Sequence, residues 1–244
     1  MYLDYSFPKE LKNAQEKRTP LVIVGGTVEY HGPHCSYGCD TLIAQGLLEK
    51  LAEKKEILIA PSISYSPASW AVGNDKSGTV HVRERAFEDY LYYVFKSLLT
   101  AGNRNIYILI HHQFEQESEM PMTLCYRTAA KRATMEYLEE TLGQGWWGSE
   151  SYANYYQELE GDNNPFSWIK VVPTMSTKVQ NATGYDHAGK YECSILMALY
   201  PDCVKKERID DVKHWFTESA KEANLELGKI MVEKSLEYLE KTIV

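Results

Sequence analysis

Short apolar runs alternate along this chain with longer stretches in which apolar residues recur at helical spacing. The first run, residues 21–24, is β-branched at three of its four positions and ends at two glycines, as a buried strand would. The expected strands are 21–24, 57–60, 106–110 and 168–173. The expected helices are a short one within 1–19, then 41–54, 83–101, 118–142, 185–200 and 210–242. This alternation predicts an α/β fold, a three-layer α/β/α sandwich around a mostly parallel central sheet.

Length and composition refine this expectation. The 244 residues, 44% hydrophobic and 25% charged, are typical of a globular protein, and we expect one domain over 1–244 rather than two small ones. Residues 144–167 are turn-rich and aromatic, which we interpret as an insertion over the active site or at an oligomer contact. The net charge of −8, without a basic cluster, argues against nucleic-acid or anionic-membrane partners.

The five cysteines, an odd number, fit no disulfide framework. Cys35 and Cys39 have a spacing that would allow them to bind zinc, but the sequence lacks a second cysteine pair at ligand spacing, so reduced and packed thiols are expected. The amino-terminal residues contain no apolar stretch of a signal peptide, and the apolar runs are shorter than the ~20 residues of a membrane span. We therefore expect a cytoplasmic protein.

Three polar clusters carry the candidate chemistry. The first follows strand 21–24 and contains Glu29, His31, His34 and Asp40, with Asp40 where the N-cap of the next helix is expected. Ligand sites of open α/β sheets lie at the carboxyl ends of the strands. Carboxylate and imidazole donors suit a divalent ion such as zinc or manganese. A surface histidine and an aspartate that only caps a helix are the alternative interpretation.

The second cluster, residues 111–116, directly follows the strongly apolar strand 106–110 and contains His111, His112, Gln113 and Glu115. The third cluster, residues 185–194, contains His187 and Glu192 at the start of an expected helix. Exposed histidines in the second cluster, and helix capping or core packing by Glu192, are the alternatives.

The first cluster, Glu29-x-His31-Gly32-x-His34 followed by Asp40-Thr41-Leu42, resembles the signature of the creatininase (creatinine amidohydrolase) family. The resemblance implies a creatininase-like fold and a binuclear metal centre, with zinc or manganese at one or two positions per chain. It makes Glu29, His31 and Asp40 ligands, and Asp40 the bridge between the ions.

In the second cluster the resemblance is imperfect. The family pattern Asn-Gly-His-x-Glu-Asn, placed without gaps, aligns its glutamate with Glu115 and its metal-binding histidine with Gln113. Either a one-residue shift makes His112 the ligand, or Gln113 replaces it. The third cluster resembles His-Ala-Gly-x-x-Glu-Thr-Ser, with a cysteine at 193. The resemblance implies that His187 handles protons and that Glu192 supports a ligand or is one itself.

The implied function is a metal-dependent hydrolase in which a metal-bound hydroxide attacks a carbonyl of a small cyclic amide. A first alternative is a hydrolase that opens a cyclic diketone, 3-dehydro-scyllo-inosose, by cleaving a carbon–carbon bond. A second is a non-catalytic member with an impaired metal site. Trp70 in the long loop 62–82, Tyr185 and Trp168 are expected to contact the substrate. The resemblance also implies a homo-oligomer, a hexamer in much of the family.

Overall fold

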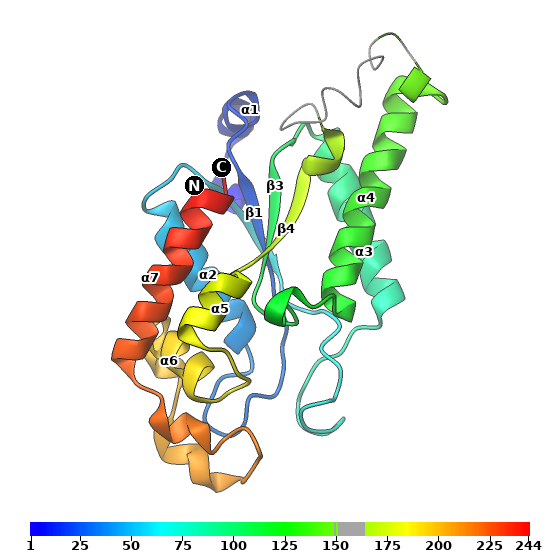
Figure 1. Ribbon diagram of the computed structural model, residues 1–244. Coiled ribbons are helices and arrows are strands. Elements are labelled where there is room, and N and C mark those ends of the chain that lie inside the picture. The colour runs from blue at the N-terminus through cyan, green and yellow to red at the C-terminus, as the bar shows by residue number, and fades with distance from the viewer. Residues whose placement is uncertain (149, 151–163) are drawn as a thin grey trace.

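The computed structural model describes residues 1–148, 150 and 164–244 and is built on a parallel sheet (Figure 1). Its four strands are β1 (Leu21–Gly25), β2 (Leu58–Ile63), β3 (Ile106–Ile110) and β4 (Ile169–Pro173), in the order β2-β1-β3-β4. All three neighbouring pairs are parallel. Every residue of β1 and β3 is buried, which explains their continuous apolar sequences, because both faces of a parallel sheet are covered.

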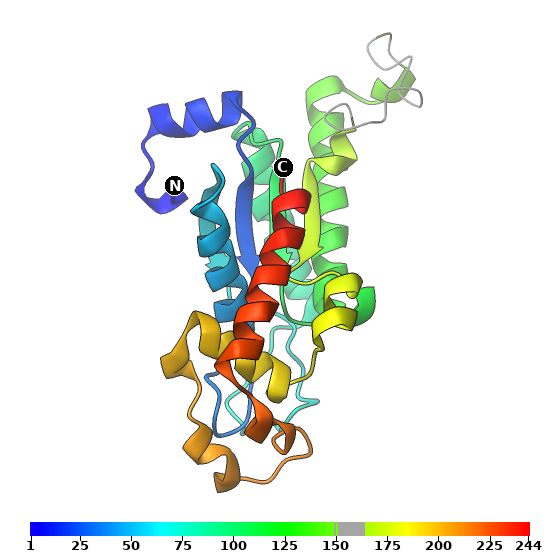
Figure 2. The ribbon, with the colours of Figure 1, turned by 60° about the vertical axis from the view of Figure 1, so that its left-hand side comes forward.

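Helices cover both faces of this sheet (Figures 1 and 2). Val22 and Val24 point to one face, where they pack with α2 (Cys39–Ala52), α5 (Thr177–Thr183), α6 (Lys190–Leu199) and α7 (Leu225–Thr242). Leu21 and Ile23 point to the other, where they pack with α3 (Glu84–Thr100) and α4 (Pro121–Leu142). This arrangement confirms the expected three-layer α/β/α sandwich.

Shorter helical segments connect these elements. The helix near the amino terminus is α1 (Pro8–Glu16), preceded by the 3₁₀ turn η1 (Leu3–Tyr5). The other described 3₁₀ segments are η2 (Glu115–Glu117), η3 (Trp146–Gly148), η6 (Pro165–Ser167), η7 (Pro201–Cys203), η8 (Lys206–Asp211) and η9 (Ser219–Glu222).

Two boundary predictions were wrong. Strand β2 does not stop at Pro61 but continues to Ile63, because it is an edge strand, where a missing backbone N–H is tolerated. The helix expected over 210–242 begins only at Leu225, where the Asn224 side chain accepts a hydrogen bond from the Leu227 N–H.

The four strands end at the same edge of the sheet, and the three polar clusters follow at that edge. Most of the expected insertion 144–167 lies outside the described residues, and its described ends, η3 and η6, lie towards the opposite edge (Figure 1). Among the described residues, no helix combines the length and apolar character needed to cross a bilayer.

Candidate metal centre

The segment after β1 folds back on the start of α2 and brings its polar residues inside the protein. The Glu29 N–H donates to the Tyr37 carbonyl (3.0 Å), and the Thr41 hydroxyl donates to the Thr27 carbonyl (3.0 Å). Asp40 was expected at the N-cap, but the cap is Gly38 and Asp40 lies within the first turn. Its side chain is therefore not used for capping and is buried, only 2% exposed, facing the end of β3.

A first group of donors consists of Glu29, Asp40 and His112, which are all buried. His112 Nδ1 lies 3.2 Å from Glu29 Oε2 and 3.4 Å from Asp40 Oδ2. Three side chains from two strand ends and one helix start thus meet at a single point. The geometry brings His112, rather than Gln113, into this group.

A second group is arranged around His31, which is also buried. Its Nε2 lies 3.6 Å from Asp40 Oδ2 and 3.5 Å from Glu192 Oε2. Its Nδ1–H donates to the Glu29 carbonyl (3.0 Å), which leaves the lone pair on Nε2, directed at the two carboxylates. Asp40 therefore contacts the histidines of both groups.

Glu192 lies in the first turn of α6. Its Oε2 accepts a hydrogen bond from the Ala188 N–H (2.6 Å), and the Asp186 carboxylate accepts from the N–H groups of Tyr191 and Glu192 (3.0 Å each). Asp186 thereby fixes the start of α6 and the direction of Glu192. This contact places Glu192 beside His31 rather than on the outer face of the helix.

Three of the facing atoms, Glu29 Oε2, His31 Nε2 and Asp40 Oδ2, are buried without a hydrogen-bond partner. Leaving a buried polar atom unsatisfied costs about 1–3 kcal/mol, and more when the group is charged. A divalent cation would satisfy all three, and carboxylate oxygens with imidazole nitrogens are ligands that zinc and manganese accept. The residues present therefore fit a metal centre.

The electrostatics of the site also favour a cation. Burial lowers the pKa of His112, but the negative charges of the adjacent Asp40 and Glu29 outweigh this effect and raise the pKa to about 10. Burial raises the pKa of Asp40, yet the nearby His31 and His112 bring it well below its usual range. The Asp40 carboxylate therefore remains ionised and attracts positive charge, which a proton or a metal ion can supply.

Two other expected ligands are placed differently. Gln113 lines the pocket, but its Oε1 accepts a hydrogen bond from the Met122 N–H (3.1 Å) and its backbone carbonyl accepts from the Thr123 hydroxyl (2.8 Å). Its side chain therefore caps the start of α4. Glu115 lies in η2 at the pocket wall, exposed, and is not part of either donor group.

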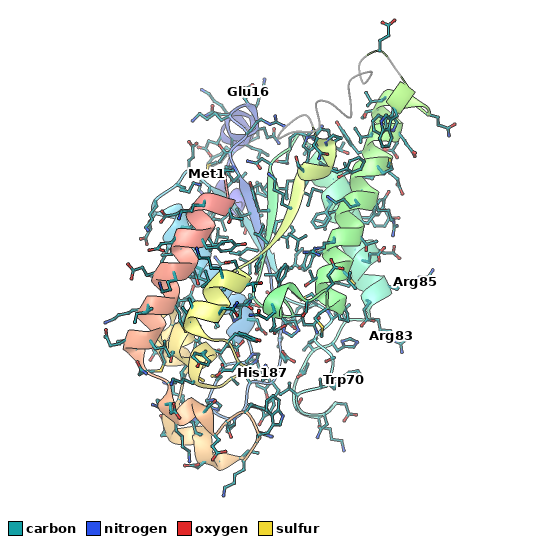
Figure 3. The ribbon with its side chains drawn as sticks, in the orientation of Figure 1. Met1, Glu16, Trp70, Arg83, Arg85 and His187 are labelled. Atoms are coloured by element: carbon teal, nitrogen blue, oxygen red, sulfur yellow. The ribbon has the colours of Figure 1, made fainter. Side chains whose placement is uncertain are left out.

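His187 lies over the second group. Its ring is 4.3 Å from the His31 ring, centroid to centroid, and its Nε2–H donates to the Tyr30 carbonyl (3.1 Å). Phe216 packs edge-on against the same ring at 5.1 Å. His187 is thus held at the pocket wall, at the carboxyl-end edge of the sheet (Figure 3).

The three aromatic residues expected to contact substrate have different positions. Tyr185 lines the pocket. Trp70 packs against His81 (4.9 Å), and its neighbours Ser69 and Ala71 line the pocket. Trp168 immediately precedes β4, at the opposite edge of the sheet, beside Tyr137 and under the Arg104 guanidinium, so the expectation that it lies at the site is not met.

The donors open onto a pocket of about 450 Å³, a size that suits a small molecule. Part of its wall is apolar and comes from Trp215 and Phe216, together with Ala68, Val72 and Met120. Trp215 and Phe216 were not predicted as site residues, because the segment that contains them was expected to be helical. The sequence does contain one indication of their role, because these two aromatic residues are adjacent in a segment that is otherwise charged.

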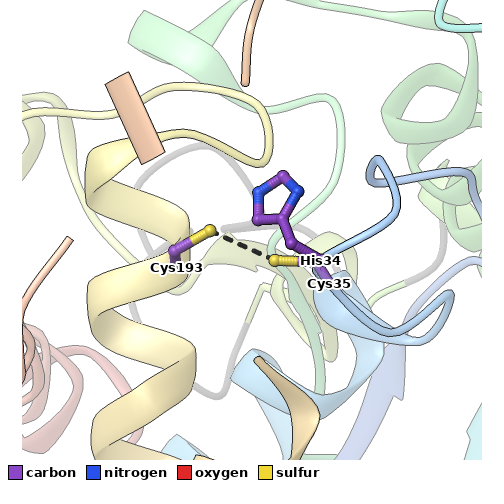
Figure 4. Close-up of side chains that lie close together, drawn as sticks. All are labelled: His34, Cys35 and Cys193. Atoms are coloured by element: carbon purple, nitrogen blue, oxygen red, sulfur yellow. Dashed lines mark hydrogen bonds between the residues drawn. The ribbon is translucent and has the colours of Figure 1, made fainter. Parts of the chain in front are cut away.

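Two buried thiols, those of Cys35 and Cys193, face each other next to His34 (Figure 4). Cys35 Sγ and Cys193 Sγ are 3.1 Å apart, and the neighbouring His34 donates from Nε2 to the Ala188 carbonyl (2.8 Å). All five cysteines are free and four of them are buried, which agrees with the expectation of reduced, packed thiols.

Comparisons with known proteins show which sequences and structures this chain resembles. A family model described as Creatininase (Creatinine amidohydrolase) matches residues 6–242. A 3-dehydro-scyllo-inosose hydrolase of Thermotoga maritima is 28% identical over 125 residues, which is 51% of this chain and only 39% of that protein. A creatinine amidohydrolase of Pseudomonas putida is 22% identical over 198 residues, 78% of this chain and 68% of that protein.

Solved structures show the same fold. The structure named Creatininase Mn has a TM-score of 0.74 at 17% identity and covers 99% of this chain and 96% of that one. A creatininase variant of Zn-Zn type has a TM-score of 0.72 at 17% identity with the same coverage.

Proposed function

Because the chain belongs to the creatininase family, we propose that it is a metal-dependent hydrolase acting on a carbonyl of a small molecule. The observation that carries this proposal is the pair of donor groups that share Asp40 at the base of the pocket. Hydrolysis at such a site requires a nucleophile, a group that moves protons and a space for the substrate. The described residues supply the group that moves protons and the space for the substrate, and they would hold the metal ion that provides the nucleophile.

Glu29, Asp40 and His112 would hold a first ion, and His31, Asp40 and Glu192 a second. Similar folds carry manganese or zinc, and these are the ions we propose here. A bound divalent ion lowers the pKa of its water from 15.7 towards ~7 and polarises a carbonyl oxygen. This assignment makes Glu192 a ligand, which is one of the two roles expected for it, and leaves Glu115 outside the centre.

His187 is the proposed proton carrier. Its Nε2–H is committed to the Tyr30 carbonyl, so Nδ1 is the nitrogen that accepts a proton and passes it to the leaving group. The contacts with His31 and Phe216 fix the plane of the ring. Because it lines the pocket beside the donors, His187 can reach a substrate bound there.

The proposed substrate is a small cyclic amide. The pocket is of suitable size, and Trp215, which is 79% exposed, supplies a flat apolar surface against which a ring can stack. A cyclic diketone such as 3-dehydro-scyllo-inosose is the second candidate, favoured by the 28% identity with a hydrolase of that name. Both reactions begin with attack of hydroxide on a ring carbonyl.

The non-catalytic alternative depended on Gln113 in place of a metal-binding histidine. Because His112 completes the first donor group while Gln113 caps α4, that reason no longer applies.

The test is to load the purified protein with zinc or manganese and to incubate it separately with creatinine, a formamide and 3-dehydro-scyllo-inosose. Metal content by elemental analysis and loss of each compound are measured in parallel. We expect two equivalents of metal and turnover of one of the three compounds, abolished in His187→Gln without loss of metal. A protein without bound metal, or one that keeps full turnover in His187→Gln, would contradict the proposed mechanism.

A further inference from the structure

His111 directly follows β3 and is not required by either donor group described above, yet its side chain is buried and directed at Glu192. Its Nε2 lies 3.3 Å from Glu192 Oε1, and the donor atoms of Asp40, His111 and Glu192 lie within 4.8 Å of one another. Hydrogen bonds from ring N–H groups to oxygen are usually about 2.7–3.2 Å long. The contact is longer than this range.

The other ring nitrogen of His111 has a close partner. Nδ1 lies 2.7 Å from Thr174 Oγ1, and Thr174 is fixed because its backbone N–H donates to the Ile110 carbonyl (2.8 Å). In the tautomer in which Thr174 accepts from Nδ1–H, the lone pair of the imidazole lies on Nε2 and faces a carboxylate. Two lone pairs in contact repel each other unless a proton or a metal ion lies between them. Histidines that bind metals have this arrangement, with the second nitrogen donating to an oxygen.

The two carboxylate oxygens of Glu192 face different histidines. Oε1 lies 3.3 Å from His111 Nε2 and Oε2 lies 3.5 Å from His31 Nε2, while Asp40 Oδ2 lies 3.6 Å from His31 Nε2. These separations are close to the ~3.3–3.4 Å between neighbouring ligand atoms of an ion with bonds of ~2.0–2.1 Å. We propose that His111 is the fourth protein ligand of the second ion, beside His31, Asp40 and Glu192. This inference rests on the proposed function.

The consequence is a division of roles between the two ions. Four protein ligands close the second position, as in sites that hold an ion for structure, whereas catalytic ions keep a position open for water. The first position has three protein ligands and lies at the pocket. The first ion therefore exchanges with added metal, and the second is retained.

The first experiment measures metal retention. Wild type, His111→Ala and the control His81→Ala, which removes a histidine stacked on Trp70, are loaded with zinc, dialysed against a chelator and analysed for metal. We expect wild type and the control to retain the second ion, and His111→Ala to bind it more than about 100-fold more weakly, since loss of even an outer partner of a ligand costs about 10–100-fold. Unchanged retention in His111→Ala would overturn the proposal.

The second experiment separates a ligand from a residue that only orients Glu192. His111→Cys is loaded with cobalt(II), and its near-ultraviolet spectrum is compared with those of cobalt-loaded wild type and His111→Ala. A thiolate at position 111 gains a sulfur-to-cobalt charge-transfer band only if it touches the ion. Weakened binding in His111→Ala without that band in His111→Cys would assign an orienting role and overturn the proposal. If wild type binds two ions but either variant gives the contrary result, only the role of His111 is overturned and the proposed function stands. If wild type binds no ion, the role of His111 and the proposed function are both overturned.

Discussion

His31 Nε2 lies 3.6 Å from Asp40 Oδ2, and both atoms are buried without a hydrogen-bond partner. The same Asp40 oxygen is 3.4 Å from His112 Nδ1. One carboxylate thus stands between the histidines of two donor groups.

Asp40→Asn is expected to weaken binding of both ions, because the uncharged amide replaces the only carboxylate that the two positions share. We expect more than about 100-fold lower affinity at each position, exceeding the ~10–100-fold cost of losing an outer partner. Titration with zinc against a competing chelator measures this effect. Glu115→Gln is the matched control, since Glu115 lies at the pocket wall outside both groups. Loss of metal in the control alone would reverse the assignment.

The stability of the metal-free protein is expected to fall as the pH is raised. The folded-state pKa of His112 is about 10, above its ordinary value of 6.5. A raised pKa contributes stability that is fully present below the unfolded value and is lost as the pH rises through the folded value. Thermal unfolding of chelator-treated protein should therefore show a decline between about pH 6.5 and 10 that is reduced in His112→Gln. Metal should bind more tightly over the same interval, since it displaces that proton.

Gln113→Ala is expected to lower stability and to spare the metal. The Gln113 side chain accepts from the Met122 N–H at the start of α4, and loss of a comparable helix cap costs about 1 kcal/mol. Urea denaturation and elemental analysis of the same preparation check the two halves of this prediction. If the metal is lost while the free energy of unfolding stays unchanged, Gln113 is a ligand and not a cap.

Gly228→Ala is expected to disturb the site from a distance. A methyl group at Gly228 would lie 1.9 Å from the Ser194 carbonyl oxygen, so α7 must move away from α6, the helix that carries Glu192. Such overpacking costs about 1–3 kcal/mol. Gly148→Ala, where an added methyl meets nothing within 4 Å, is the control. Equal free energies of unfolding for the two variants would show that the α6–α7 contact adapts easily.

The layers of the fold could be predicted from the sequence because a strand that is buried on both faces has a continuous run of apolar residues, as β1 and β3 do. The first cluster could also be predicted from the sequence, since Glu29, His31 and Asp40 belong to one continuous segment. The choice between His112 and Gln113 was not, because it depends on how the chain turns after Ile110. Gln113 and Gln116 have φ values of 54° and 50°, and these two left-handed residues redirect the segment in a way that residue types do not reveal.

The stretch before α7 shows a different limit of sequence analysis. Residues 210–223 have the charge and spacing of a surface helix, but they form η8, η9 and a loop that carries Phe216 to His187. The contact between Phe216 and His187, which are distant in sequence, outweighs the local preference of this segment for a helix. Glu192 was likewise left open between two roles, because its direction is set by Asp186 and by the neighbouring His31.

The donors come from three parts of the chain that are far apart in sequence: the segment around Asp40, the end of β3, and α6 near the carboxyl terminus. A nascent or partly folded chain therefore has no assembled cage, and uptake of the ions must follow the docking of α6. Metal occupancy then reports that folding has been completed. For the metal-binding protein proposed above, a shortage of zinc or manganese would leave a folded but less stable form, open to proteases at the segments that the ions would otherwise hold together.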